Sequence, residues 1–334
     1  MKSFSFLILV FTITLFTACS TKKVYEPKLV VGDWQEYGDS NETISDVASN
    51  VALLQNGNIL SKDNLIDIKK INESFRVLSL SDGWIISSNI DGNLTLDYVD
   101  DDSMQEKFEL KKTIAAASIK DNILAVLFAD NEMALYSIST KELIFKERGN
   151  SQKIIDSRVV NPYFMNDLVL FSTLDGKIII VNSKLKKRLR TVIVSSEDYF
   201  NNIIYFNIID NKIVAVTTNK ILSMGEKEIR VKYEIRNVID VDNTIFITTK
   251  QGEVISLTSE LQLKAKIKFP FAHFLGMIHN NDKLYLLEKG GYLIEMSKDL
   301  SDYKVYEVDI EDGYIFVTDK KFYIDDEYIS TEQK

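Results

Sequence analysis

The sequence has few of the residues on which most enzymes and metal proteins depend. Its 334 residues include 1 cysteine, 2 histidines and 3 prolines. A single cysteine excludes a disulfide framework and any multi-cysteine zinc or iron–sulfur site. Two histidines leave little for a histidine metal cluster or a Ser-His-Asp triad. We therefore predict no catalytic residues, no metal and no cofactor.

An excess of positive charge is also missing. The net charge is −9, whereas nucleic acids and anionic membrane surfaces attract proteins with a basic footprint. The hydrophobic fraction of 45% is ordinary for a globular protein and excludes wholesale disorder. What the chain does must therefore be read from the order of its residues.

The N-terminus has the pattern of a secretory signal. Lys2 precedes an uncharged stretch over residues 4–18, which is shorter than the ~20 apolar residues of a membrane span. The stretch ends in Leu-Phe-Thr-Ala before Cys19, which resembles the lipobox of bacterial lipoproteins. The resemblance implies that Cys19 is lipidated and becomes the new N-terminus. An ordinary signal peptide or an uncleaved anchor is the alternative.

The residues after Cys19 suggest the destination and the domain boundaries. Ser20 stands where an aspartate commonly signals inner-membrane retention, so the resemblance implies the outer membrane, with inner-membrane sorting still open. The polar stretch that follows predicts a flexible tether. We expect a signal peptide over residues 1–18, a lipidated tether over 19–45, and a folded domain over 46–334.

Hairpin signals recur along the folded domain at intervals of about 38 residues. Each is a short polar turn between two runs rich in β-branched and aromatic residues. The turns are Asn56-Gly57, Asp91-Gly92, Asp130-Asn131, Asp175-Gly176, Asn219-Lys220, Gln251-Gly252, Gly290-Gly291 and Asp319-Lys320. This spacing favours an all-β fold, a single eight-bladed β-propeller of four-stranded blades, over seven blades, paired β-sandwiches or a β-helix. We expect N-terminal strands to pair with C-terminal ones and close the ring.

Two segments carry a family resemblance. Residues 134–145, Ala-Leu-Tyr-Ser-Ile-Ser-Thr-Lys-Glu-Leu-Ile-Phe, resemble the quinoprotein-type (PQQ-like, also WD40-like) propeller repeat, with Lys141 in place of its glycine. Residues 161–176, from Asn-Pro to Asp-Gly, are similar to the run that begins such a blade. With the lipobox, this combination resembles the B lipoproteins of the outer-membrane β-barrel assembly machinery. The motifs cover two blades, Phe145 stands in place of the consensus tryptophan, and tryptophan occurs only at Trp34 and Trp84 instead of once per blade.

A few surface residues are candidates for contacts. The largest basic cluster is Lys184, Lys186, Lys187, Arg188 and Arg190, which is either a solvated turn or a docking patch for an acidic partner. Asn41 follows Asp39 and precedes Glu42-Thr43, which resembles a bacterial N-glycosylation sequon. Phe269, Phe271 and Phe274 indicate a buried strand and its connecting loop, or alternatively a surface anchor.

These observations favour a scaffold over an enzyme. The resemblance implies an outer-membrane lipoprotein that faces the periplasm and binds proteins of the β-barrel assembly complex, supporting insertion of outer-membrane proteins. A ligand-binding or quinone-dependent propeller, with its site in the axial funnel, is the first alternative. The second alternative is an envelope adhesin on the same fold, which would be exposed at the cell surface.

Overall fold

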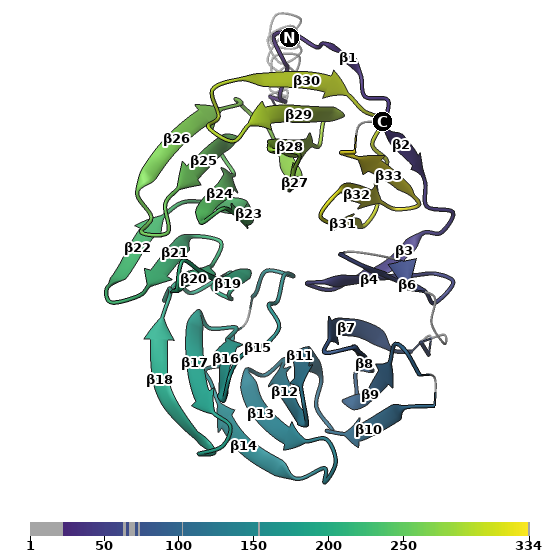
Figure 1. The fold of residues 1–334 in the computed structure, drawn as a ribbon, viewed down its shortest axis with the longest axis vertical. Helices are drawn as coiled ribbons and strands as arrows, with labels where there is room; N and C mark the ends of the chain where they lie inside the picture. Colours follow the sequence, from purple (N-terminus) through teal and green to yellow (C-terminus); the bar gives the residue numbers. More distant parts are fainter. Residues whose placement is uncertain are drawn as a thin grey trace, which may run out of the picture.

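The computed structural model describes residues 23–62, 65–66, 71–72, 74–101, 103–152 and 154–332. Across these ranges the chain forms strands, turns and loops, and none of the described segments is a helix that could span a membrane. Eight separate sheets surround a common axis (Figure 1). The predicted eight-bladed β-propeller is therefore confirmed, and the seven-bladed alternative is wrong.

Each blade has four antiparallel strands, which we letter A to D from the axis outward (Figure 1). Blades 1 to 4 contain β3 (Ile44–Val47), β4 (Val51–Leu54), β5 (Ile59–Ser61), β6 (Leu65–Ile66); β7 (Arg76–Ser81), β8 (Trp84–Ser88), β9 (Asn93–Tyr98), β10 (Gln105–Glu109); β11 (Ile114–Lys120), β12 (Ile123–Phe128), β13 (Glu132–Ser137), β14 (Leu143–Arg148); and β15 (Tyr163–Met165), β16 (Leu168–Ser172), β17 (Lys177–Asn182), β18 (Lys187–Ile193).

Blades 5 to 7 continue in the same order around the ring. They contain β19 (Tyr205–Ile209), β20 (Lys212–Val216), β21 (Lys220–Met224), β22 (Glu228–Lys232); β23 (Ile235–Val241), β24 (Thr244–Thr249), β25 (Glu253–Leu257), β26 (Leu263–Lys268); and β27 (Phe274–Asn280), β28 (Lys283–Glu288), β29 (Tyr292–Ser297), β30 (Tyr303–Glu307).

Blade 8 joins the two ends of the described chain. Its strands are β31 (Ile315–Val317), β32 (Lys321–Ile324), β33 (Glu327–Ser330) and the N-terminal β2 (Tyr37–Asp39). β2 lies antiparallel to β33, with Tyr37 opposite Ile329. The short strand β1 (Gly32–Asp33) adds a fifth, parallel strand outside β30. The predicted closure of the ring by N-terminal strands is confirmed.

This closure moves the start of the propeller earlier than residue 46. Trp34 is buried, its ring packs edge-on against Tyr285 and Tyr306, and its Nε1 donates to the carbonyl oxygen of Ser330 at 2.9 Å. Residues 32–45, which we predicted as tether, are thus held by blades 7 and 8. The tether prediction was based on the polar composition of this stretch. Strand pairing and one buried tryptophan hold the stretch against blades 7 and 8 despite that composition.

Seven of the predicted hairpin turns join strands B and C of blades 1 to 7. The last, Asp319-Lys320, instead joins strands A and B of blade 8, whose B–C turn is Asp325-Asp326. The number of blades was correct although this turn was assigned to the wrong place. Both turns carry the aspartate that favours tight turns, so the turn residues alone could not distinguish them.

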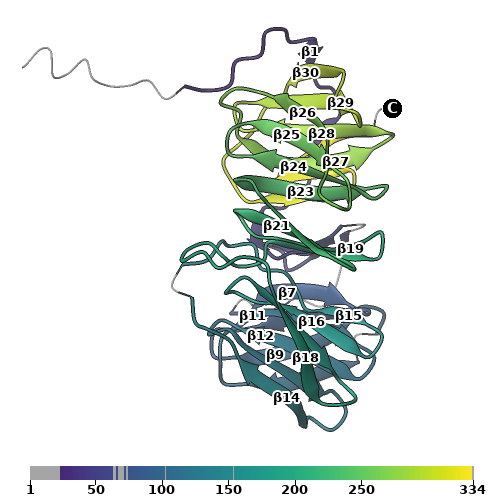
Figure 2. The same cartoon turned by 90° about the vertical axis from the view of Figure 1, so that its left-hand side faces the viewer.

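The core lies between neighbouring blades. Between blades 4 and 5, for example, Leu170 and Ile178 of blade 4 pack in one buried cluster with Ile213 and Ala215 of blade 5. Because strand direction alternates within a blade, the B–C turns and the loops between blades lie on one face of the disc. We call it the loop face, and we call the opposite side, with the A–B and C–D turns, the turn face (Figure 2).

Candidate interaction surfaces

The predicted basic cluster lies on the outer rim of blade 4. Lys184 and Lys186 are in the turn between β17 and β18, and Lys187 begins β18, whose side chains are almost all exposed. Lys186 has a φ of 52°, and Lys141, at the glycine position of the propeller repeat in blade 3, has a φ of 61°. Lysines therefore adopt the left-handed backbone conformation at positions where the consensus repeat has glycine.

Most of the cluster's charges are paired with acidic residues. Lys184 lies 2.9 Å from Asp167, Arg188 bonds Glu147 of blade 3, and Arg190 lies 2.7 Å from Glu228 of blade 5. Exposed pairs of this kind contribute at most about 1 kcal/mol each. Among the described residues, Lys186 and Lys187 make no ion pair. The charge free to attract a partner is therefore smaller than the sequence suggested.

Charge is nevertheless segregated around the ring. Residues 111–268, which span blades 3 to 6, contain 24 Lys and Arg against 18 Asp and Glu, a net charge of +6. The remaining residues contain 16 basic and 31 acidic side chains, a net charge of −15. The basic cluster on β18 thus lies within a positive half of an acidic molecule. Such a field steers an acidic partner toward one side of the rim.

The axis of the ring is crossed by the loop over residues 149–162, of which all but residue 153 are described. Figure 1 shows this loop, between β14 and β15, reaching into the middle of the ring. Asn161 donates to Ser49 Oγ of blade 1 at 2.7 Å, and Arg158 donates to the carbonyl oxygen of Arg236 of blade 6. Neither blade is a neighbour of blade 4, so the loop bridges the ring.

The same loop is held by its neighbours. Asp156 N–H donates to Asn202 Oδ1 at 2.8 Å, and Ser118 Oγ donates to the carbonyl oxygen of Pro162 at 2.5 Å. Burial disfavours the ionised form of Asp156, but hydrogen bonds and charge from Arg158 outweigh it, so the pKa of Asp156 is lowered. The axial position, where a ligand-binding or enzymatic propeller would hold its substrate, is thus occupied by a braced loop.

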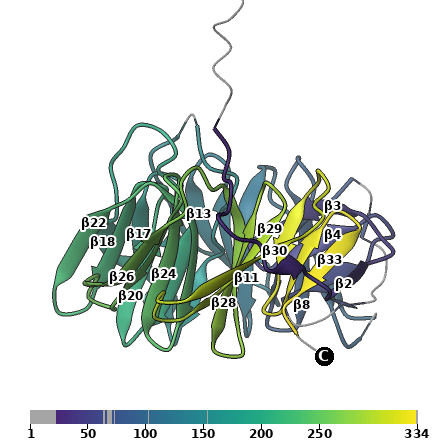
Figure 3. The ribbon, with the colours of Figure 1, turned by 90° about the horizontal axis from the view of Figure 1, so that it is seen from above.

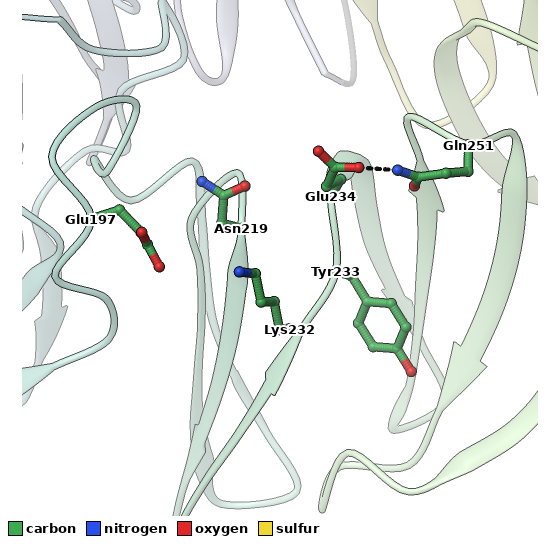
Figure 4. A pocket seen from close by; sticks show the side chains of 6 residues that line it. All are labelled: Glu197, Asn219, Lys232, Tyr233, Glu234 and Gln251. Carbon is green, nitrogen blue, oxygen red and sulfur yellow. Dashed lines mark hydrogen bonds between the residues drawn. The ribbon is translucent and has the colours of Figure 1, made fainter.

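A polar recess of about 530 Å³ lies on the loop face between blades 5 and 6 (Figure 4). It is lined by Glu197, Asn219, Lys232, Tyr233, Glu234 and Gln251. The Glu234 carboxylate accepts a hydrogen bond from Gln251, and Glu197 pairs with Lys220 at 3.3 Å. The recess can take up a polar side chain, but it presents no paired nucleophile and base among these lining residues.

Three carboxylates could hold a cation at the edge of blade 8. Oxygen atoms of Glu311, Asp325 and Asp326 lie within 4.8 Å of one another. Beside them, partial burial and the surrounding carboxylates raise the pKa of Glu327. The cluster is partly exposed, and three carboxylates are fewer than the roughly six to eight oxygen ligands that Ca²⁺ takes.

Of the two predicted modification sites, Asn41 lies among the described residues. Cys19 lies outside the described residues. Asn41 is exposed in the turn between β2 and β3, where its N–H donates to Asp39 Oδ1 and its neighbour Ser40 donates to the carbonyl oxygen of Asp326 at 2.7 Å. Asn41 is therefore in an ordered turn instead of a free tether, and its glycosylation stays a prediction.

The two histidines lie in different environments, and so do Phe269, Phe271 and Phe274. His273 Nε2 lies 2.7 Å from Arg236 Nη1, whereas His279 lies on β27 with a pKa lowered by burial. Phe269 and Phe274 are buried, as predicted for a strand and its connecting loop. Phe271 between them is 55% exposed.

The fold and these surfaces define a closed eight-bladed propeller with a braced axis and broad, unevenly charged faces. No family model matches the chain. In sequence, it is 29% identical over 91% of its length to the plasminogen-binding protein PgbB of Helicobacter pylori strain J99. The PgbB of strain 26695 is 28% identical over the same share. The chain spans 64% of the length of each relative.

Among solved structures, the propeller is similar to BamB from Moraxella catarrhalis. The TM-score is 0.67 at 10% identity, covering 88% of this chain and 98% of that one. The C-terminal WD40 domain of Sif2 gives a TM-score of 0.63, also at 10% identity, covering 90% and 99%. At this identity the likeness concerns the fold alone, and in fold it confirms the predicted resemblance to the B lipoproteins.

Proposed function

We propose that the protein is an outer-membrane lipoprotein, anchored through Cys19, that acts as a scaffold by binding other proteins. The uneven distribution of charge around the ring is the main support for the protein-binding part of this proposal. It offers an acidic partner one favoured side, the rim of blades 3 to 6, with Lys186 and Lys187 unpaired at its surface. The occupied axis supports binding at the outer surfaces over chemistry at the centre. The names of the sequence relatives also describe a binding protein.

The partner that we propose first is the outer-membrane β-barrel assembly complex, facing the periplasm. A lipid anchor confines the propeller near any membrane-embedded partner and raises its effective concentration there. Loss of the protein should then lower the levels of outer-membrane barrel proteins. Normal barrel levels in a deletion strain, with no assembly subunit recovered by crosslinking in intact cells, would exclude this partner.

The rim is tested by reversing its free charges. Lys186→Glu combined with Lys187→Glu should lower the yield of partner crosslinking, because the local field changes sign. A matched control is Lys107→Glu combined with Lys304→Glu, two exposed lysines on the outer strands of blades 2 and 7 on the acidic half. An unchanged yield for the β18 variant would make the cluster a solvated turn.

A second candidate function is binding of a host protein at the cell surface. The sequence similarity to two plasminogen-binding proteins favours it. Purified full-length chain immobilised on a sensor should then bind plasminogen, and intact cells should bind it less after deletion of the gene. Absence of binding in both assays would leave the periplasmic scaffold as the proposal.

A further inference from the structure

The N-terminal segment rests on the loop face of the propeller. Tyr25 is only 7% exposed, and its ring lies 5.9 Å from Phe269 and 5.7 Å from Tyr292, in edge-on contacts. Phe269 lies in the loop from blade 6 to blade 7, and Tyr292 begins strand C of blade 7. Figures 2 and 3 show the segment leaving the disc on this side, whereas the C-terminus lies on the other.

The anchoring residue cannot be far from this face. Cys19 is six residues before Tyr25, which allows at most about 20 Å of extended chain. The tether that we predicted over residues 19–45 would have let the propeller turn freely. With Tyr25 seated on blades 6 and 7, a lipid on Cys19 instead holds the loop face toward the bilayer.

The loop face also carries exposed apolar side chains at its loop tips. Their exposed fractions range from 44% to 77%, and they come from turns and loops of five parts of the ring: Ile90, Ile154, Tyr199, Phe200, Phe271 and Tyr314. Tyrosine and phenylalanine side chains at loop tips are suited to the boundary between lipid headgroups and acyl chains.

The A–B turns of the turn face are acidic. Seven of its eight A–B turns contain an aspartate: Asp82, Asp121, Asp167, Asp210, Asp242, Asp282 and Asp319. Aspartate favours these tight turns, and its charge also favours water over a lipid surface. Acidic residues also lie on the loop face, among them Glu311, Asp325 and Asp326. The difference between the faces is that both exposed phenylalanines of the described residues, Phe200 and Phe271, lie on the loop face.

Two of the aromatic residues hold unfavourable backbone conformations. Phe200 has a φ of 52° and Phe271 a φ of 69°, in the left-handed region that bulky residues rarely adopt. Local hydrogen bonds maintain both turns: Phe200 N–H donates to the carbonyl oxygen of Ile154 at 3.1 Å, and Ala272 N–H to that of Phe269 at 3.1 Å. The surrounding structure therefore fixes both turns although their backbone conformation is unfavourable.

We infer that the loop face of the propeller lies on the lipid bilayer, with Phe200 and Phe271 at the membrane interface and the turn face in water. The Nζ of Lys23 lies 5.4 Å from the ring centroid of Phe271, which places a positive charge at the same point for lipid phosphates. The inference rests on the proposed lipid anchor at Cys19. It names the bilayer itself as the partner of this face.

Site-specific fluorescence quenching tests this orientation. The full-length lipidated chain is reconstituted into vesicles of phosphatidylethanolamine and phosphatidylglycerol with doxyl-labelled lipids. Single cysteines are introduced by Phe271→Cys or Tyr314→Cys on the loop face and by Leu185→Cys, 60% exposed, on the turn face. Each is labelled with an environment-sensitive fluorophore. The parent chain, whose only cysteine is blocked when acylated, serves as the unlabelled control.

We expect the doxyl lipids to quench roughly half or more of the fluorescence at Phe271→Cys and Tyr314→Cys, and to leave Leu185→Cys unchanged. Phe200→Ser with Phe271→Ser should reduce quenching at Tyr314→Cys at least about twofold. Equal quenching on both faces, or none on the loop face, would overturn the inference.

Two further readouts separate the possible failures. Mass spectrometry of the N-terminal peptide and sedimentation with the vesicles report the anchor independently of orientation. An acylated, sedimenting chain without loop-face quenching therefore overturns the orientation but not the anchor. Labels that are unquenched in vesicles yet protected in native envelopes would mean that a membrane protein covers the face, and lipid contact would be wrong.

Discussion

Replacing Trp34 by alanine should destabilise the whole propeller, because Trp34 links the N-terminal segment to the two blades that close the ring. Its indole contacts Tyr285 and Tyr306 of blade 7, and its Nε1 donates to the carbonyl oxygen of Ser330 in blade 8. Loss of a buried tryptophan side chain typically costs about 3–5 kcal/mol. The Ser330 carbonyl oxygen would also lose a buried donor.

The expected loss is measurable by urea and thermal unfolding of the full chain. At about 2 °C per kcal/mol for a protein of this size, Trp34→Ala should lower the Tm by roughly 6–10 °C. Trp84→Ala in blade 2 is the matched control, since Trp84 is only partly buried and its ring contacts Tyr98 of the same blade instead of joining blades 7 and 8. A Trp34→Ala chain as stable as the parent would refute closure through this residue.

Three other predictions concern stability. Burial opposes ionisation of Asp175, but hydrogen bonds from Lys177, Thr173 and Asn131 outweigh it and lower its pKa. The stability that ionised Asp175 contributes is therefore fully present above the unfolded-state pKa of about 4. It is lost as the pH falls through the lower pKa of Asp175 in the folded state. Measured by urea unfolding at pH 7, Asp175→Asn should have a lower free energy of unfolding than the parent. The difference in unfolding free energy should narrow toward pH 2, and a constant difference would contradict this. Gly252→Ala should cost more than about 2 kcal/mol, because φ is +74° and the new carbon would lie 2.1 Å from the Phe269 carbonyl oxygen, whereas Gly225→Ala meets only the flexible Lys212 stem. Equal melting temperatures for these two variants would argue against the turn geometry. Deleting the chain from Asp309 should destabilise the entire propeller, and an unchanged Tm would indicate an open array.

The sequence predicted the fold because turn chemistry is local. Asn-Gly and Asp-Gly pairs between β-rich runs require left-handed turns, and the regular spacing of those turns gave the number of blades. Closure of the ring by N-terminal strands was also predicted, but the residues that close it were not identified. The contacts of Trp34 join residues almost 300 positions apart, which no local pattern in the sequence indicates.

The basic cluster shows the same limit at the level of a site. Arg188 and Arg190 are neutralised by Glu147 and Glu228, which lie on adjacent blades about one repeat away in sequence. Such pairs become visible only when the blades are placed side by side. Likewise, the loop over residues 149–162 reads as an ordinary connection, although it crosses the ring to blade 1.

The most direct test of the scaffold is co-purification from detergent-solubilised envelopes. The tagged full chain and its Cys19→Ala variant are compared for membrane association and for the proteins that they retain. We predict that the parent is acylated, sediments with the outer membrane and retains subunits of the β-barrel assembly complex, whereas Cys19→Ala is released and retains far less. A Cys19→Ala chain that still sediments as an uncleaved precursor, or a parent that retains no envelope protein, would contradict the account.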